Sequence, residues 1–118
     1  MMKKQVVLVE DNASIRELIE YILADHDIDV VSFATAGNFR NAKAEVSPNL
    51  YILDIMLPDG NGIDLCKELK AEEATQQTPI IMMSAHFDQV DNQCEAQDFI
   101  AKPFDIDHFL SRIAQQID

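Results

Sequence analysis

The sequence predicts an α/β fold in which helices cover both faces of one parallel β-sheet. Short apolar runs alternate with segments of helical spacing along the chain, which favours parallel strands joined by right-handed crossovers. Three of the runs are apolar almost throughout, as is typical of strands that are buried on both faces. The length of 118 residues fits a single domain, 1–118.

Five runs rich in β-branched or aromatic residues predict the strands. In chain order they are VVLV at 6–9, DVVSF at 29–33, LYIL at 50–53, PIIMM at 79–83 and DFIA at 98–101. The runs are short and stand well apart, so each is expected to form one strand of the sheet.

Four segments between and after these runs have the spacing of amphipathic helices. The first carries an apolar stripe at i, i+3, i+4, i+7 and i+8, formed by Ile15, Leu18, Ile19, Ile22 and Leu23. The other three segments are 36–46, 63–73 and 105–117, and Asp105 is expected to cap the last one.

Composition excludes several classes of function. Twenty-one acidic residues against nine basic ones give a formal net charge of −12, which repels phosphate backbones and anionic membrane surfaces. We therefore expect no direct binding to nucleic acid or to a membrane. The two cysteines, Cys66 and Cys94, lack the spacing of a zinc site or a disulfide framework. A cytoplasmic location is expected.

Polar residues follow four of the predicted strands at the point where each strand ends. Glu10 and Asp11 follow the first strand, Asp54 the third, Ser84 the fourth and Lys102 the fifth. Ligand sites of open α/β sheets form just beyond the carboxyl ends of the strands. These five side chains are therefore expected to meet at one edge of the sheet.

The residue types at this edge indicate phosphoryl chemistry with a metal ion. Carboxylates a few ångströms apart repel by about 4 kcal/mol per pair at an effective dielectric constant near 20, so they protonate or recruit a cation. Mg²⁺ suits such oxygen ligands, whereas no EF-hand loop for Ca²⁺ is found in the sequence. Lys102 and Ser84 suit the oxygens of a transferring phosphoryl group, and Asp54 suits the attacking carboxylate.

Four segments in this order, VLVEDN, LDIMLPDGNG, MSA and AKPF, resemble the response-regulator receiver domain of two-component signalling. The resemblance runs from about Gln5 to the C-terminus. It implies a flavodoxin-like, doubly wound sheet of five parallel strands in the order 2-1-3-4-5. It also implies a switch more than an enzyme, phosphorylated by a sensor histidine kinase or phosphotransfer protein and acting on a downstream protein target or output domain.

The resemblance further implies roles for individual residues. Asp54 matches the phosphoacceptor, Ser84 and Lys102 match the residues that contact the phosphoryl group, and Phe99 matches the aromatic switch residue. The metal ligands implied for Mg²⁺ are Glu10, Asp11, Asp54 and the backbone carbonyl of Met56.

One segment departs from the family pattern. The stretch between Ser84 and Lys102 is shorter than usual by about one helical turn, and Gly is missing before DFIA. We therefore expect a fourth helix that is shortened or loose, with weak hydrogen-exchange protection across 87–96. Asp59 and Asp64 are expected to be turn or cap residues and not ligands.

Two alternative functions stay open at this point. One is a metal-dependent phosphohydrolase with an aspartyl-phosphate intermediate, which would usually carry a second acid two residues after Asp54, where this chain has Met56. The other is a non-phosphorylated pseudo-receiver that works by protein contact alone.

Overall fold

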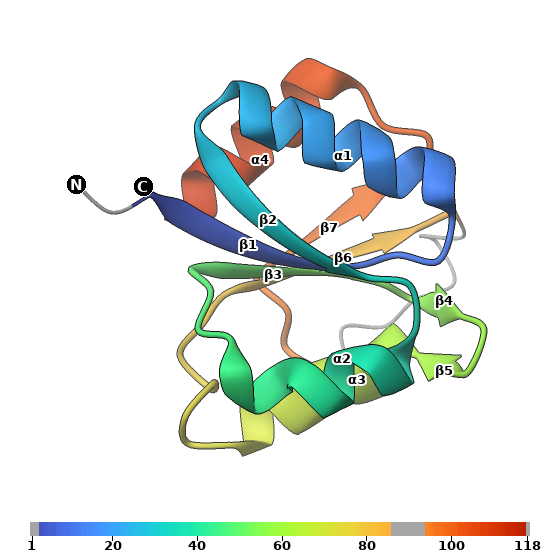
Figure 1. Ribbon diagram of the computed structural model, residues 1–118, viewed down its shortest axis with the longest axis vertical. Coiled ribbons are helices and arrows are strands. Elements are labelled where there is room, and N and C mark those ends of the chain that lie inside the picture. Colours follow the sequence, from blue (N-terminus) through green and yellow to red (C-terminus); the bar gives the residue numbers. More distant parts are fainter. Residues whose placement is uncertain (1–2, 86–93, 118) are drawn as a thin grey trace.

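The computed structural model describes residues 3–85 and 94–117 and has a central parallel sheet of five strands (Figure 1). The strands are β1 (Lys4–Val9), β2 (Ile28–Phe33), β3 (Leu50–Asp54), β6 (Ile80–Ser84) and β7 (Asp98–Ala101), in the spatial order β2-β1-β3-β6-β7. The short strands β4 (Met56–Leu57) and β5 (Gly60–Asn61) pair only with each other, as an antiparallel hairpin. Counting the sheet strands alone, the order is 2-1-3-4-5, which confirms the predicted topology.

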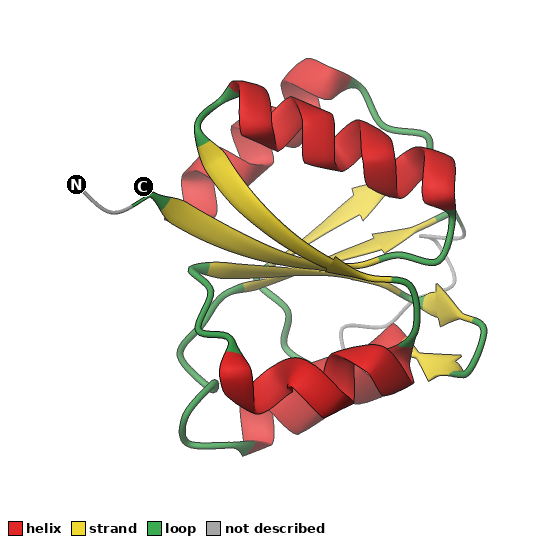
Figure 2. Cartoon of the chain, viewed as in Figure 1, coloured by secondary structure: helices red, strands yellow, loops and turns green. Residues whose placement is uncertain are grey.

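Helices cover both faces of this sheet, as predicted (Figures 1 and 2). The helices α1 (Ala13–Asp25) and α4 (Ile106–Ile117) lie on one face, and α2 (Ala36–Ala42), the 3₁₀ helix η1 (Lys43–Glu45) and α3 (Gly62–Ala71) lie on the other. Asp105 caps α4 as expected, because its Oδ2 accepts a hydrogen bond from the backbone N–H of His108 at 3.0 Å. The side chains of Asn12, Thr35 and Asn61 accept equivalent bonds at the starts of α1, α2 and α3.

The core consists of two apolar clusters that are separated by the sheet. On β1 and β3, Val7 and Leu53 pack toward α2 and α3, whereas Leu8 and Ile52 pack toward α1 and α4. Every residue of β3 and β6 is buried. Burial on both faces is the reason why these strands are apolar almost throughout rather than alternating with polar residues.

The shortened or loose helix expected across 87–96 lies mostly outside the described residues. Where the description resumes, Cys94 belongs to a turn and Glu95 has a positive φ of 58°. The Cys66 thiol on α3 donates a hydrogen bond to the Cys94 carbonyl at 3.4 Å, which ties the backbone at Cys94 to α3.

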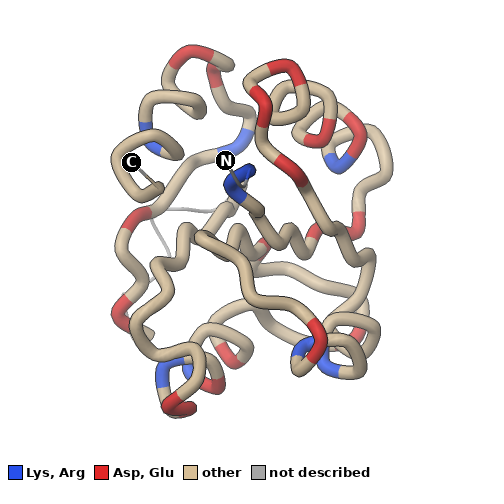
Figure 3. Tube along the Cα trace, turned by 60° about the vertical axis from the view of Figure 1, so that its left-hand side comes forward, with Lys and Arg blue, Asp and Glu red and all other residues tan. Residues whose placement is uncertain are grey.

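The surface carries the acidic charge that the composition predicts. Asp and Glu are spread over helices and loops in all parts of the fold, and Lys and Arg are fewer (Figure 3). Within residues 3–85 and 94–117, no helix combines the length and apolar character that a membrane span requires.

Candidate functional site

The predicted site residues lie at the carboxyl edge of the sheet. Parallel pairing brings the ends of the strands into line, with Asp54 of β3 beside Met83 of β6 and Ser84 of β6 beside Ala101 of β7. The backbone N–H of Lys102 then donates to the Ser84 carbonyl at 2.9 Å, which continues the sheet by one step. The sheet thus fixes the positions of residues that are far apart in the sequence.

Three carboxylates meet at this edge. Glu10, Asp11 and Asp54 each offer an oxygen, and these oxygens all lie within 4.8 Å of one another. Glu10 is fully buried, Asp54 is 3% exposed and Asp11 is exposed. The cluster therefore has two buried carboxylates and one that faces solvent, so a hydrated cation can reach it.

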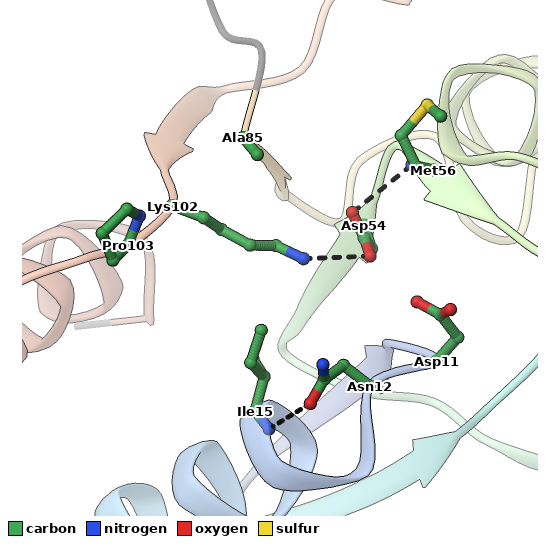
Figure 4. A pocket seen from close by; sticks show the side chains of 8 residues that line it. All are labelled: Asp11, Asn12, Ile15, Asp54, Met56, Ala85, Lys102 and Pro103. Atoms are coloured by element: carbon green, nitrogen blue, oxygen red, sulfur yellow. Dashed lines mark hydrogen bonds and ion pairs between the residues drawn. The ribbon is translucent and has the colours of Figure 1, made fainter.

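Lys102 joins two of the three carboxylates. Its Nζ lies 2.7 Å from Glu10 Oε1 and 3.0 Å from Asp54 Oδ2. In Figure 4 the lysine extends from the end of β7 toward Asp54, and Asp11 approaches from the end of β1. Burial alone lowers the pKa of Lys102, but the hydrogen bonds to Glu10 and Asp54 outweigh burial and raise it above its usual value.

Glu10 has a strongly perturbed carboxyl group. Its pKa is raised to about 7, chiefly by burial and also by the adjoining Asp54, while Lys102 acts in the opposite direction. One of its oxygens, Oε2, is buried and has no hydrogen-bond partner among the described residues. A buried carboxylate oxygen without a partner is costly, and a bound cation would satisfy it.

A cavity of about 470 Å³ opens over Asp54 (Figure 4). Its lining comes from the start of α1 and from the residues at or just beyond the ends of β1, β3, β6 and β7. Met56 stands at its rim with 66% of its surface exposed, and its backbone N–H donates to Asp54 Oδ1 at 3.3 Å. Ser84 is 2% exposed at the end of β6, and Phe99 is half-buried against the cluster beneath α2 and α3. The structure thus places all of the predicted site residues at or next to this edge.

Sequence reasoning missed one residue of the site. Arg16 lies in the first turn of α1, and its Nη1 donates to the backbone carbonyl of Glu10 at 2.9 Å and to that of Asp11 at 3.5 Å. These bonds hold the loop that carries both acids. A basic residue in the first turn opposes the helix dipole, and this mismatch is a signal that could have drawn attention to Arg16, although it does not specify the contact.

The loop after Asp54 is fixed by two contacts. Asp59 accepts hydrogen bonds from the backbone N–H groups of Ala36 and Gly37, both at 2.9 Å, which hold its pKa below the usual value and confirm it as a cap residue. Gly62 donates its N–H to the Ile55 carbonyl at 2.9 Å. A Cβ at position 62 would lie only 2.1 Å from the Asp54 carbonyl oxygen, so this close approach requires glycine.

Comparison with known proteins assigns the family. The model of the response regulator receiver domain matches residues 6–114. The chain belongs to this family. The receiver domain is 36% identical over 114 residues to the transcriptional regulatory protein GltR of Pseudomonas aeruginosa, a match that covers 93% of this chain and 47% of GltR. It spans about half the length of the curated relatives that it matches.

Solved structures agree with the receiver fold. The BeF3-activated N-terminal receiver domain of RstA from Klebsiella pneumoniae is 29% identical, with a TM-score of 0.83 over 97% of this chain and 98% of that one. The receiver domain of a sensor histidine kinase from P. aeruginosa, solved with a magnesium ion coordinated in its active-site cleft, is 24% identical and has a TM-score of 0.89 over 98% of each chain. This second likeness shows the fold. The family consists of signalling switches, and its acidic site binds Mg²⁺.

Proposed function

We propose that this receiver domain accepts a phosphoryl group on Asp54 from a sensor histidine kinase or phosphotransfer protein. The observation that carries the proposal is the pairing of one ammonium group, that of Lys102, with two buried carboxylates inside a three-carboxylate cluster. Burying such a cluster of charges is costly, and costly clusters of this kind are found mainly at functional sites. Here the carboxylates suit a cation and the lysine suits an anion.

The residues present fit Mg²⁺. Glu10, Asp11, Asp54 and the backbone carbonyl of Met56 would hold it, and the unpartnered Oε2 of Glu10 supports this assignment. When bound, the ion neutralises charge on the phosphoryl oxygens during transfer. The magnesium ion in the cleft of the sensor-kinase receiver domain is further support.

The protein side chains then divide the work of transfer. An oxygen of Asp54 forms the new bond to phosphorus while the bond between phosphorus and the donor histidine nitrogen breaks. Lys102 is within reach of Asp54 and shifts its hydrogen bond from the carboxylate to a phosphoryl oxygen. The Ser84 hydroxyl would donate to a second phosphoryl oxygen, and its position at the end of the neighbouring strand supports this role.

The product acts as a switch. Phosphorylation replaces the single negative charge of the Asp54 carboxylate by a phosphoryl group that carries about −1.5 to −2. This change in charge biases an existing equilibrium between inactive and active conformations. Phe99, half-buried on the strand next to Ser84, is the side chain proposed to follow this change. We propose that the domain acts in the cytoplasm on an output domain or a separate protein target and makes no direct contact with nucleic acid, given its net charge of −12.

The proposal is tested with acetyl phosphate and Mg²⁺, with the intact mass of the protein as the readout. Wild type should gain one phosphoryl group that is lost on removal of the donor, Asp54→Ala should gain none, and the exposed Asp64→Ala should behave as wild type. A wild type that gains no mass, or an Asp54→Ala variant that does, overturns the proposal. Steady turnover of generic phosphate monoesters would instead favour a phosphohydrolase, although Met56 has no proton to give a leaving group.

A further inference from the structure

A second cavity lies at the edge of the sheet opposite to the phosphoacceptor. It measures about 300 Å³ and is enclosed by the segment that follows η1 and by the turns that follow α3. In Figure 1 these two connections lie side by side at the end of the sheet remote from β4 and β5. Its floor is Tyr51, which precedes Asp54 by three residues in β3, or roughly 10 Å along the strand.

The hydroxyl of Tyr51 has no hydrogen-bond partner among the residues that the structure describes. The ring is 1% exposed and packs edge-on against Phe39, with the ring centroids 5.9 Å apart and an interplanar angle of 78°. In residues 3–85 and 94–117 no hydrogen bond to this hydroxyl is found, yet it is not one of the sealed atoms without a partner. The hydroxyl therefore opens into the cavity that Tyr51 lines, and whatever fills this cavity must satisfy it.

The charged groups around the cavity cancel each other. Lys43 Nζ and Glu72 Oε1 form an ion pair at 2.5 Å. Burial raises the pKa of Tyr51, and the charge of Glu72 adds to this, so the phenol keeps its proton and can donate it. A charged occupant would lose water without finding a free counter-ion here, which disfavours both anions and cations.

The remaining lining defines the hydrogen-bond pattern of the occupant. The Thr75 hydroxyl donates to the Leu69 carbonyl at 2.6 Å, so that only its lone pairs remain, and these accept. Val46, Pro48 and Ala74 supply apolar wall, and Ser47 and Thr78 add two further hydroxyl side chains. An occupant that matches Tyr51, Thr75 and the apolar wall carries one acceptor for Tyr51, one donor for Thr75 and an apolar body.

We propose that this cavity binds a small uncharged amide, whose carbonyl oxygen accepts from the Tyr51 hydroxyl and whose N–H group donates to Thr75 Oγ1. A volume of about 300 Å³ corresponds to roughly ten water molecules and lies at the lower end of the range for small-molecule sites. The site is distinct from the phosphoacceptor cavity and shares none of its lining residues.

Benzamide is a suitable probe, because benzoate and benzylammonium have nearly the same shape and carry opposite charges. In a titration followed by backbone amide chemical shifts, benzamide should give saturable shifts around Val46, Tyr51 and Thr75, with a dissociation constant on the order of 1 mM. Both charged probes should bind at least about tenfold more weakly. Equal affinity for the three probes, or no saturable shift at these residues, overturns the proposal and indicates that the cavity holds only water.

Tyr51→Phe tests the hydrogen bond with little effect on the fold, since the hydroxyl that it removes makes no hydrogen bond to another residue in the described part of the chain. Its urea midpoint should equal that of wild type, and its affinity for benzamide should fall about fivefold, as expected for one lost hydrogen bond. Tyr21→Phe is the matched control, because Tyr21 is 73% exposed on α1. Unchanged benzamide affinity in Tyr51→Phe would refute the assigned contact.

Discussion

Gly62 is the position where one added methyl group should do most harm next to Asp54, the proposed phosphoacceptor. A Cβ there would lie 2.1 Å from the carbonyl oxygen of Asp54 and 2.9 Å from its carbonyl carbon, so the backbones must separate by more than 1 Å to reach ordinary contact. Both atoms belong to the buried end of β3 and cannot rotate away. We expect Gly62→Ala to lower the free energy of unfolding by about 3 kcal/mol, even though alanine has the better helix propensity.

Urea denaturation of Gly62→Ala and Gly60→Ala tests this expectation. Gly60 lies two residues earlier, in the β4–β5 hairpin, but a Cβ there meets only the Cβ of Ala36 at 3.6 Å, so the stability of Gly60→Ala should differ from that of wild type by less than about 0.5 kcal/mol. Because the clash displaces Asp54, Gly62→Ala should also weaken the binding of beryllium fluoride with Mg²⁺ by at least tenfold. Equal stability of the two variants would refute the argument from close approach.

Three further variants test other contacts of the site. Arg16→Gln should weaken Mg²⁺ affinity about tenfold by releasing the loop of Glu10, and the exposed neighbour Glu17→Gln should not, as a magnesium titration followed by NMR would show. Asp59 has a lowered pKa in the folded state, so its stabilisation is present above about pH 4 and is lost as pH falls through the folded value. The urea midpoint of wild type should therefore exceed that of Asp59→Asn at pH 7 and converge with it near pH 3, and a constant difference would contradict this. Met56→Asn places an amide at the exposed rim of the cavity and should change the dephosphorylation rate in a phosphate-release assay, whereas an unchanged rate would count against a role for position 56.

The strands could be predicted because burial on both faces leaves a continuous apolar run. Each of the five predicted strands is present, with bounds that differ by a residue or two from the runs. The β4–β5 hairpin was missed, since strands of two residues are too short to show a period. The pairing order came from the family resemblance, because an apolar run does not specify its neighbours.

Helix boundaries and faces were predicted less well. The segment 36–46 was expected to be one helix, but α2 ends at Ala42 and continues as η1. Leu18 was placed in the buried stripe of α1 and is 42% exposed, because the buried face is the narrower set Ile19, Ile22 and Leu23. Leu18 instead lines a small apolar hollow with Phe104.

The parts of the candidate site that follow from strand topology were predictable. The contacts that depend on side-chain conformation were not. Parallel strands bring their carboxyl ends to one edge, so the meeting of Glu10, Asp54 and Lys102 follows from the pattern alone. The contact of Arg16 depends on a side chain that folds back over its own helix start. No spacing rule specifies such a path, and only coordinates reveal it.

The hydrogen bonds of Lys102 have a consequence for the sequence of events at the site. The ammonium group holds Glu10 and Asp54 together, so the positions of these two carboxylates do not depend on a cation. Three carboxylates and one ammonium still leave the pocket negative, and a negatively charged phosphodonor is repelled. A cation held by Glu10, Asp11 and Asp54 would offset this charge before a donor approaches, and Lys102 would then be free to contact the phosphoryl group.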